Sequence, residues 1–268
     1  LIFNTMKFDK KIKYFNLTFY VLLLFLFILI VEGIFHHFYY KISQAFDFLP
    51  YKNQSGHNKY IWDENGIIEF LQVIILFVSL TFIIKHIINI SSDLKFKLKS
   101  LLILYLIGVL YYFFEEISWG QHLIGWQTPE FFLKINTQNE TNIHNASSLF
   151  NELPRNLLLI WCTLSFLIMN KLKSDSQYLN HFIFPNRNLK SISILILILF
   201  IPEFIVDKLD LAPGDRAKND TEIRLAIFYD IIGFNFIRFS ELQELLFNYY
   251  IFWHAYYLDK FKQYERII

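Results

Sequence analysis

The stretch YFFEEISWGQH places two adjacent carboxylates at the end of a strongly apolar run. Glu115 and Glu116 are followed within two helical turns by Trp119, Gln121 and His122. Glu115, Trp119 and His122 share one face if the helix continues past Glu116. An ionised carboxylate beside lipid costs several kcal/mol unless it is paired, bound to a metal or facing water. We therefore expect these side chains to face a polar pocket.

Further acidic residues recur at helical spacing in other apolar stretches. Residues at i, i+3, i+4 and i+7 lie on one face of a helix. By this rule Glu69 shares a face with Gln72, about one turn inside an apolar run. Glu241, Glu244 and Asn248 line one side of the last apolar stretch. We expect these acids to form a ring around the same pocket.

A polar segment, NTQNETNIHN, follows the EEISWGQ block after a short amphipathic stretch. The triplet Thr128–Glu130 has a Thr that can cap a helix and a Pro that suits its first position. This helix is expected to lie in the plane of the membrane. Glu140 and His144 are spaced as a ligand pair if the polar segment is helical, and Asn142 and Asn145 offer hydrogen-bonding amides.

The mixture of carboxylate, amide and imidazole groups suits a divalent cation. Histidine ligands would favour zinc, whereas carboxylates and amides alone would favour calcium, magnesium or manganese. A bound metal activates water for hydrolysis, and two carboxylates can alternatively act as acid and base without a metal. The expected metal ligands are Glu116, His122, Glu140, His144, Glu241 and Glu244. The expected catalytic residues are Glu116, Glu115, Glu69 and His144. The expected substrate-binding residues are Trp119, Gln121, Asn142 and Asn145.

The same residues also allow purely structural interpretations. Adjacent glutamates at the end of a span can be solvent-facing anchors, and Asp63 and Glu64 can stabilise a helix start through its dipole. Trp119 and Trp126 fit an aromatic belt at the membrane surface as well as a binding site.

The elements that must position these residues are long apolar segments. The chain has 268 residues, of which 54% are hydrophobic and 18% charged, whereas about a quarter are charged in soluble domains. Because helices satisfy their own backbone in lipid, we expect an all-α, polytopic membrane protein with one transmembrane domain over residues 1–268. The expected spans are 17–34, 67–84, 100–117, 156–170, 191–207 and 241–258, with an outer polar segment at 118–155.

The distribution of charge predicts the orientation. Lys and Arg are denser on the side that holds both termini, which places that side in the cytoplasm and the acidic clusters outside. We expect the chain in the inner membrane of a bacterial cell, with the lipid bilayer as its environment. The net charge of +1 and the lack of a basic face argue against a nucleic-acid partner, and the lone Cys162 rules out an internal disulfide.

The blocks EEISWGQ, TPE and NTQNETNIHN, at 115–121, 128–130 and 136–145, resemble those of a group of uncharacterised bacterial membrane proteins. The likeness extends to the helix start at 64–69 and covers about a third of the chain, but it implies no activity. A much weaker similarity links Trp62–Asn65 and Glu69 to the calcium-binding stretch of alkaline ceramidases. The histidine pairs that hold zinc in that family have no equivalents here.

These observations leave three functions open. The first is a metal-assisted hydrolase or transferase that acts on a lipid or lipid-linked substrate at the outer leaflet. The second is an ion- or proton-coupled transporter, although carrier sites usually lie near the bilayer midplane. The third is a protein that docks a partner through its acidic outer face. The oligomeric state is left open.

Overall fold

The computed structural model describes residues 2–46, 58–62, 66–89, 96–135, 141–143, 148–168, 182, 187–209 and 237–265. Within these residues every regular element is a helix and there is no strand. The prediction of an all-α protein is therefore confirmed. The chain divides into two compact units, which are described separately below.

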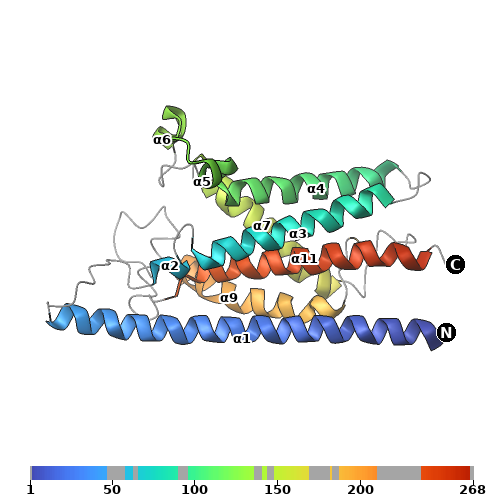
Figure 1. The fold of residues 1–268 in the computed structure, drawn as a ribbon, viewed down its shortest axis with the longest axis horizontal. Coiled ribbons are helices and arrows are strands. Elements are labelled where there is room, and N and C mark those ends of the chain that lie inside the picture. The colour runs from blue at the N-terminus through green and yellow to red at the C-terminus, as the bar shows by residue number, and fades with distance from the viewer. Residues whose placement is uncertain are drawn as a thin grey trace. The chain divides into compact units, whose positions relative to one another are not determined.

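Unit 1 comprises Leu1–Gly66 and Ile201–Leu242. Its longest element is α1 (Ile2–Phe46), and a single helical turn, α2 (Lys59–Trp62), follows later in the chain (Figure 1). The sequence of α1 is apolar along most of its length, which explains why it forms one long helix.

Two hydrogen bonds organise the described part of unit 1. The Nδ2 of Asn58, just before α2, donates to Oε1 of Glu32 in α1 at 2.6 Å. The Nη1 of Arg238 donates to the carbonyl oxygen of Trp62 at 3.2 Å, and Trp62 is fully buried. Glu32 therefore supplies α1 with a polar anchor inside an otherwise apolar stretch.

Unit 2 comprises Ile67–Phe200 and Gln243–Ile268. Its long helices are α3 (Ile67–Asn89), α4 (Phe96–Glu116) and α7 (Ser148–Ile168). Two more helices, α9 (Lys190–Leu209) and α11 (Phe239–Glu265), belong in part to each unit. Each of the six predicted apolar spans overlaps one of the long helices α1, α3, α4, α7, α9 and α11.

A hydrophobic core joins α3, α4 and α11 in unit 2. Its buried members are Leu76, Leu80, Ile83, Val109, Ile251 and Ala255. The three members on α3 are three or four residues apart and therefore lie on one face of that helix. In Figure 1, α3 and α4 lie side by side and run in opposite directions.

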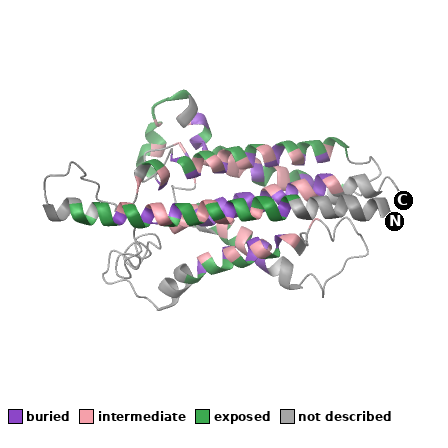
Figure 2. Ribbon diagram, turned by 60° about the horizontal axis from the view of Figure 1, so that its bottom comes forward, coloured by how far each residue is buried: buried purple, intermediate pink, exposed green. Residues whose placement is uncertain are grey.

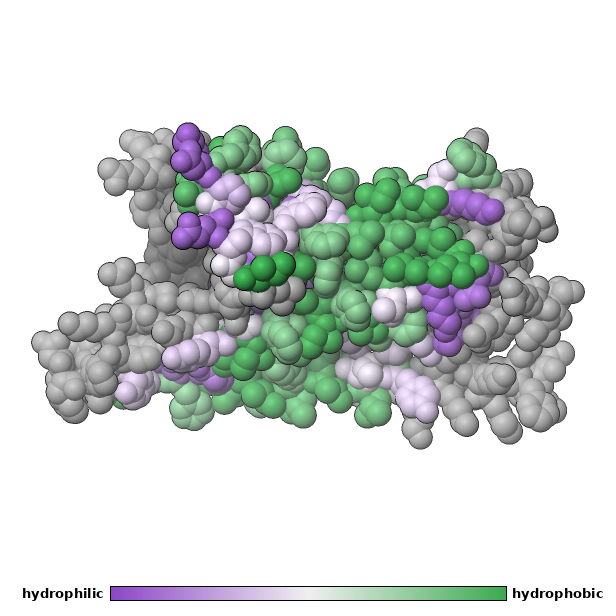
Figure 3. Space-filling model, turned by 45° about the horizontal axis from the view of Figure 1, so that its top comes forward, coloured by the Kyte–Doolittle hydropathy of each residue, from purple (hydrophilic) through white to green (hydrophobic). Residues whose placement is uncertain are grey.

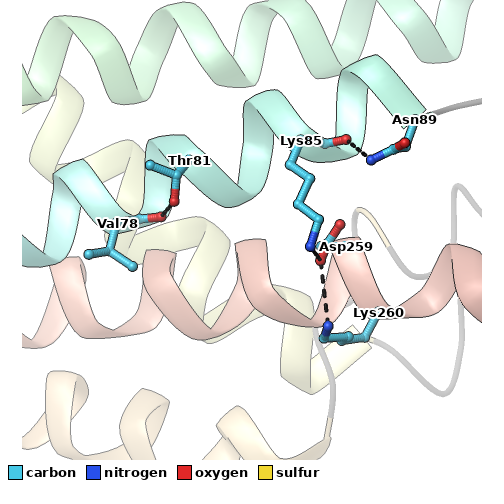
Figure 4. A network of polar contacts seen from close by, with 6 residues as sticks. All are labelled: Val78, Thr81, Lys85, Asn89, Asp259 and Lys260. Atoms are coloured by element: carbon cyan, nitrogen blue, oxygen red, sulfur yellow. Dashed lines mark hydrogen bonds and ion pairs between the residues drawn. The ribbon is translucent and has the colours of Figure 1, made fainter.

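Polar and aromatic contacts fix the register between α3 and α11. The Nζ of Lys85 lies 3.3 Å from Oδ2 of the buried Asp259, and Lys260 approaches the same oxygen at 3.8 Å (Figure 4). The rings of Phe82 and Tyr256 meet edge to face at 5.5 Å. These pairs require the two helices to run in the same direction at a fixed offset.

The surface of α3 inverts the pattern of a soluble helix. Its buried face carries the polar side chains of Gln72, Ser79 and His86, which lie about two helical turns apart. Its exposed large side chains are Ile67, Phe70, Ile74, Phe77, Ile84 and Ile88. Soluble proteins place such residues inside, so this surface fits contact with lipid.

Exposed positions are frequent along α1 and α4 as well (Figure 2). On the side of unit 2 that carries α3 and α4, a hydrophobic surface lies between hydrophilic groups near the two helix ends (Figure 3). Within the described residues, two helices are long and apolar enough to cross a membrane, Tyr14–Tyr39 and Tyr60–Asn89. The predicted number of six spans stays a prediction.

Candidate functional site

The helix that carries Glu115 and Glu116 does not continue past them. α4 ends at Glu116, and the 3-10 turn η1 (Ser118–Gly120) follows. Ser118, Trp119 and Gly120 have φ values of 45°, 55° and 95°, all in the left-handed region. The condition for a continuous helical face through Glu115, Trp119 and His122 is therefore not met. The chain turns and enters the short helix α5 (Gln121–Ile124).

The Glu115 carboxylate is engaged by the loop that follows. Its Oε1 accepts a hydrogen bond from Nε1 of Trp119 at 2.7 Å, and its Oε2 accepts one from the backbone N–H of Ile143 at 2.7 Å. The Trp119 ring also stacks on Phe114, with 5.4 Å between ring centroids. Glu115 is only 3% exposed. These contacts favour a structural role for Glu115 over the catalytic role predicted from its type.

Gln121 joins the three sequence blocks to one another. Its Nε2 donates to Oγ1 of Thr128 at 2.8 Å and to the carbonyl oxygen of Trp126 at 3.3 Å. Its Oε1 accepts from the backbone N–H of Thr141 at 2.7 Å. The side-chain amide is thus occupied at both ends, and it ties the EEISWGQ block to the TPE block and to the polar segment.

Asn142 completes this set of contacts. Its side chain is buried, and its Nδ2 donates to Oγ of Ser118 at 3.3 Å. We name Glu115, Gln121 and Asn142 the loop clamp, because each holds the segment around 141–143 to the end of α4. The helix predicted at Glu130 is present as α6 (Glu130–Ile135), whose side chains are not buried.

Several predicted ligands lie outside the described residues. Glu140 and His144 belong to this group, as does the predicted substrate-binding residue Asn145, and His122 lies on α5 with a side chain that is not described. Glu241, in unit 1, pairs with Nη1 of Arg238 at 3.4 Å. Within the described part of the chain, no group of three or more His, Cys, Asp or Glu residues is placed to hold a metal.

The register of α3 and α11 places two carboxylates level with each other. Glu69 lies about two helical turns before Leu76, and Glu244 lies about two turns before Ile251. Leu76 and Ile251 belong to the same buried core, and the two helices run in parallel. Glu69 and Glu244 therefore stand at a similar height at one end of the bundle, each on the core-facing side of its helix.

Glu116, on α4, lies at a similar level along the bundle to Glu69 and Glu244. It lies about two turns after the core residue Val109, and α4 runs opposite to α3. Figure 1 shows the start of α3, the end of α4 and the start of α11 on the same side of unit 2. We call Glu69, Glu116 and Glu244 the carboxylate tier, and all three side chains are partly exposed.

Two buried amides lie about one turn deeper than the tier. Gln72 on α3 and Asn248 on α11 are both fully buried, and both precede the core residues of their helices by about one turn. Neither was assigned a role by sequence reasoning, although each was noted on the acidic face of its helix. The sequence pattern that could have indicated them is an amide that interrupts an apolar run three or four residues after a glutamate.

A cationic side chain lies at the same end. Nη2 of Arg155 on α7 donates to Oε1 of Gln243, and Nε2 of Gln243 donates to the carbonyl oxygen of Leu199 at 2.8 Å. The guanidinium also lies over the ring of Phe200, 5.1 Å from its centroid. This network links α7, α9 and α11. Sequence reasoning missed Gln243, because nothing in its spacing distinguishes it from a surface glutamine.

The hydrophobic core forms an apolar floor beneath the amides. Beyond this floor, Nδ1 of His254 lies 3.2 Å from the Tyr105 hydroxyl, and its Nε2 lies 3.0 Å from the carbonyl oxygen of Phe182. Nδ2 of Asn188 donates to the Tyr257 hydroxyl at 3.1 Å, which places the start of α9 beside the end of α11. The far end carries Lys85, Lys99, Lys190 and Lys260. Among the described residues of unit 2, the carboxylate tier therefore lies at one end and these four lysines at the other.

No family model, curated protein or solved structure matches this chain. Its function is therefore inferred from the two ends of unit 2 and the side chains that they hold.

Proposed function

We propose that this chain is a multi-pass protein of the bacterial inner membrane with about six spans. Its six long helices cover the predicted apolar segments, and α3 has an apolar outward face with a polar inward face. Basic residues are retained in the cytoplasm. The lysine-bearing end of unit 2 then faces the cytoplasm and the carboxylate tier faces the outside. With six spans, both termini are cytoplasmic.

Within that membrane protein, we propose a hydrolase or transferase that acts on a lipid or lipid-linked substrate. One observation carries this proposal: three helices bring one carboxylate each to the same height above an apolar floor. Carboxylates in unlike surroundings can divide the roles of general acid and general base. Glu116 takes the role of base or ligand as the member of the carboxylate tier on α4, whereas Glu115 is assigned to the loop clamp.

A divalent metal belongs to the same proposal. Glu116 and Glu244 would supply carboxylate ligands, while His122, Glu140 and His144 remain predicted ligands whose side chains are not described. The identity of the metal follows from how many histidines join, since imidazole favours zinc and oxygen ligands favour calcium, magnesium or manganese. Elemental analysis of the purified protein tests this. A near-stoichiometric metal that Glu116→Gln and His144→Ala remove supports the site, and metal-free active protein contradicts it.

The enzyme is tested by Glu116→Gln with Glu130→Gln as its matched control. Both changes remove one negative charge, but Glu130 is exposed on α6 and is not a member of the carboxylate tier. The lipids of cells that produce each variant are compared by mass spectrometry with those of cells that produce the wild type. We expect Glu116→Gln to abolish a lipid conversion that Glu130→Gln retains, with both proteins folded. Equal conversion by both variants would remove Glu116 from the mechanism.

Ion-coupled transport is the second candidate. Ser79, His86 and His254 are buried along α3 and α11, at depths where a carrier would bind or relay a proton. Ser79 lies within the apolar floor, and His86 and His254 lie further from the carboxylate tier, which favours a one-sided site. Proton or substrate flux in liposomes would support the carrier. Docking of a partner protein at the outer loop is the remaining alternative, and loss of a crosslinked partner on replacing 136–145 would support it.

A further inference from the structure

Asn248 is a fully buried residue of the described core whose two polar side-chain atoms, Oδ1 and Nδ2, both lack a hydrogen-bond partner among the described residues. A buried amide without partners loses its hydration and gains nothing in return. An apolar side chain would pack at this place without that loss. A group that stabilises the protein so poorly indicates a partner that is bound during function.

The place of Asn248 shows from which side such a partner comes. It lies about one turn below Glu244 on the same face of α11, and about one turn above Ile251 in the apolar floor. The parallel register puts Gln72 of α3 at a similar height. Asn248 therefore stands between the carboxylate tier and the floor, at the bottom of the polar end.

The chemistry of the amide limits the class of partner. Oδ1 accepts a hydrogen bond and Nδ2 donates one, so both are satisfied by neighbouring hydroxyls or by one hydroxyl that donates and accepts. A metal cation would satisfy only Oδ1, and a phosphate oxygen only Nδ2. We infer that Asn248 binds hydroxyl groups of the substrate, and that the substrate is a lipid with a sugar or polyol headgroup.

This inference rests on the proposed function and narrows its substrate. One helical turn spans about 5.4 Å along the axis, so the axial separation between Asn248 and the tier is within the length of a single headgroup. Carboxylates accept hydrogen bonds from hydroxyls, and they would hold the remaining hydroxyls of a sugar. The apolar floor beneath Asn248 keeps the headgroup at one end of the bundle.

The test compares the full-length wild type, Asn248→Leu and Ser79→Ala in phosphatidylcholine nanodiscs. Ser79 is a matched buried polar residue of the bundle, but its hydroxyl is satisfied by the carbonyl oxygen of Ile75 at 2.6 Å. The probes are a diacylglycerol with a glucose headgroup and the same lipid with every sugar hydroxyl methylated. Binding is measured by native mass spectrometry and by the shift of thermal unfolding.

We expect the wild type to bind the glucosyl lipid and to discriminate against the methylated one. Asn248→Leu should melt about 2–4 °C higher than the wild type without ligand, because an unpaired amide is removed. It should bind the glucosyl lipid about 10- to 100-fold more weakly. Ser79→Ala should bind it as the wild type does.

Three results would overturn the inference: equal binding of the two lipids by the wild type, unchanged binding by Asn248→Leu, or a lower unfolding temperature of that variant without ligand. The proposed enzyme can fail separately. Selective binding of the glucosyl lipid with no lipid conversion that depends on Glu116 would contradict the enzyme and leave the headgroup assignment standing. If the protein converts only lipids without headgroup hydroxyls, the headgroup assignment is contradicted and the proposed enzyme is left standing.

Discussion

The carboxylate of Glu115 accepts a hydrogen bond from the backbone N–H of Ile143 at 2.7 Å, across 28 residues of chain. This contact joins the last turn of α4 to the polar segment that follows α6. Because Glu115 precedes Glu116, the bond also fixes the helix end from which Glu116 enters the carboxylate tier. Of these two adjacent glutamates, Glu115 belongs to the loop clamp and Glu116 to the carboxylate tier.

The first prediction concerns Glu115→Gln. A glutamine keeps one acceptor oxygen and places an NH₂ group where the second oxygen was, so either Trp119 Nε1–H or the Ile143 N–H faces another donor. We expect a loss of about 1–3 kcal/mol in unfolding free energy, with faster hydrogen exchange at Ile143. The control is Glu130→Gln, at an exposed position. Equal stability of the two variants would show that the loop clamp contributes little.

The second prediction concerns the left-handed turn after α4. Gly120 has φ 95°, and a Cβ added there would lie 3.4 Å from the Trp126 ring, whereas Gly125 has φ 76° and open space around it. We expect Gly125→Ala to cost about 1–2 kcal/mol from backbone strain alone. Gly120→Ala should cost more, because its φ of 95° lies further from the left-handed minimum than the 76° of Gly125. Thermal unfolding measures both losses, with Gly108→Ala, in a helix interior, as the control. A larger loss of stability for Gly125→Ala than for Gly120→Ala would contradict this account of the turn.

The long helices were predictable because each apolar run is long enough to satisfy its own backbone. Their polar faces were predictable too, because Glu69 with Gln72 and Glu244 with Asn248 follow helical spacing. The start of α6 at Glu130 was indicated by the preceding Thr and Pro. The spacing of residues along the sequence therefore predicts which of them share one face of a helix.

Contacts between distant segments were not predictable. Glu115 looked catalytic from its type, and only the positive φ of Ser118, Trp119 and Gly120 brings the loop back onto it. The positive φ of Gly120 suits a glycine, but those of Ser118 and Trp119 do not follow from residue type. Likewise, the bond between Arg155 and Gln243 depends on how α7 packs against α11.

The third prediction tests the height of the carboxylate tier. In a Cys162→Ala background, Glu69→Cys and Glu244→Cys are combined and treated with a short bis-maleimide. We expect efficient intramolecular crosslinking, because the parallel register sets both residues about two turns before the shared core. The control pair, Glu69→Cys with Tyr256→Cys, places one cysteine near the opposite end and should not crosslink. Crosslinking of the control alone would require a different register for α11.

The fourth prediction concerns orientation in the membrane. In the Cys162→Ala background, single cysteines replace Glu130, beyond the end of α4, and Ser100, near its start, both of which are exposed. A membrane-impermeant maleimide should label Glu130→Cys in intact spheroplasts and Ser100→Cys only after permeabilisation, since the end that holds Lys99 is expected in the cytoplasm. The reverse pattern would place the carboxylate tier inside and remove the outer leaflet as its source of substrate. Labelling of both sites from outside would mean that α4 does not cross the membrane.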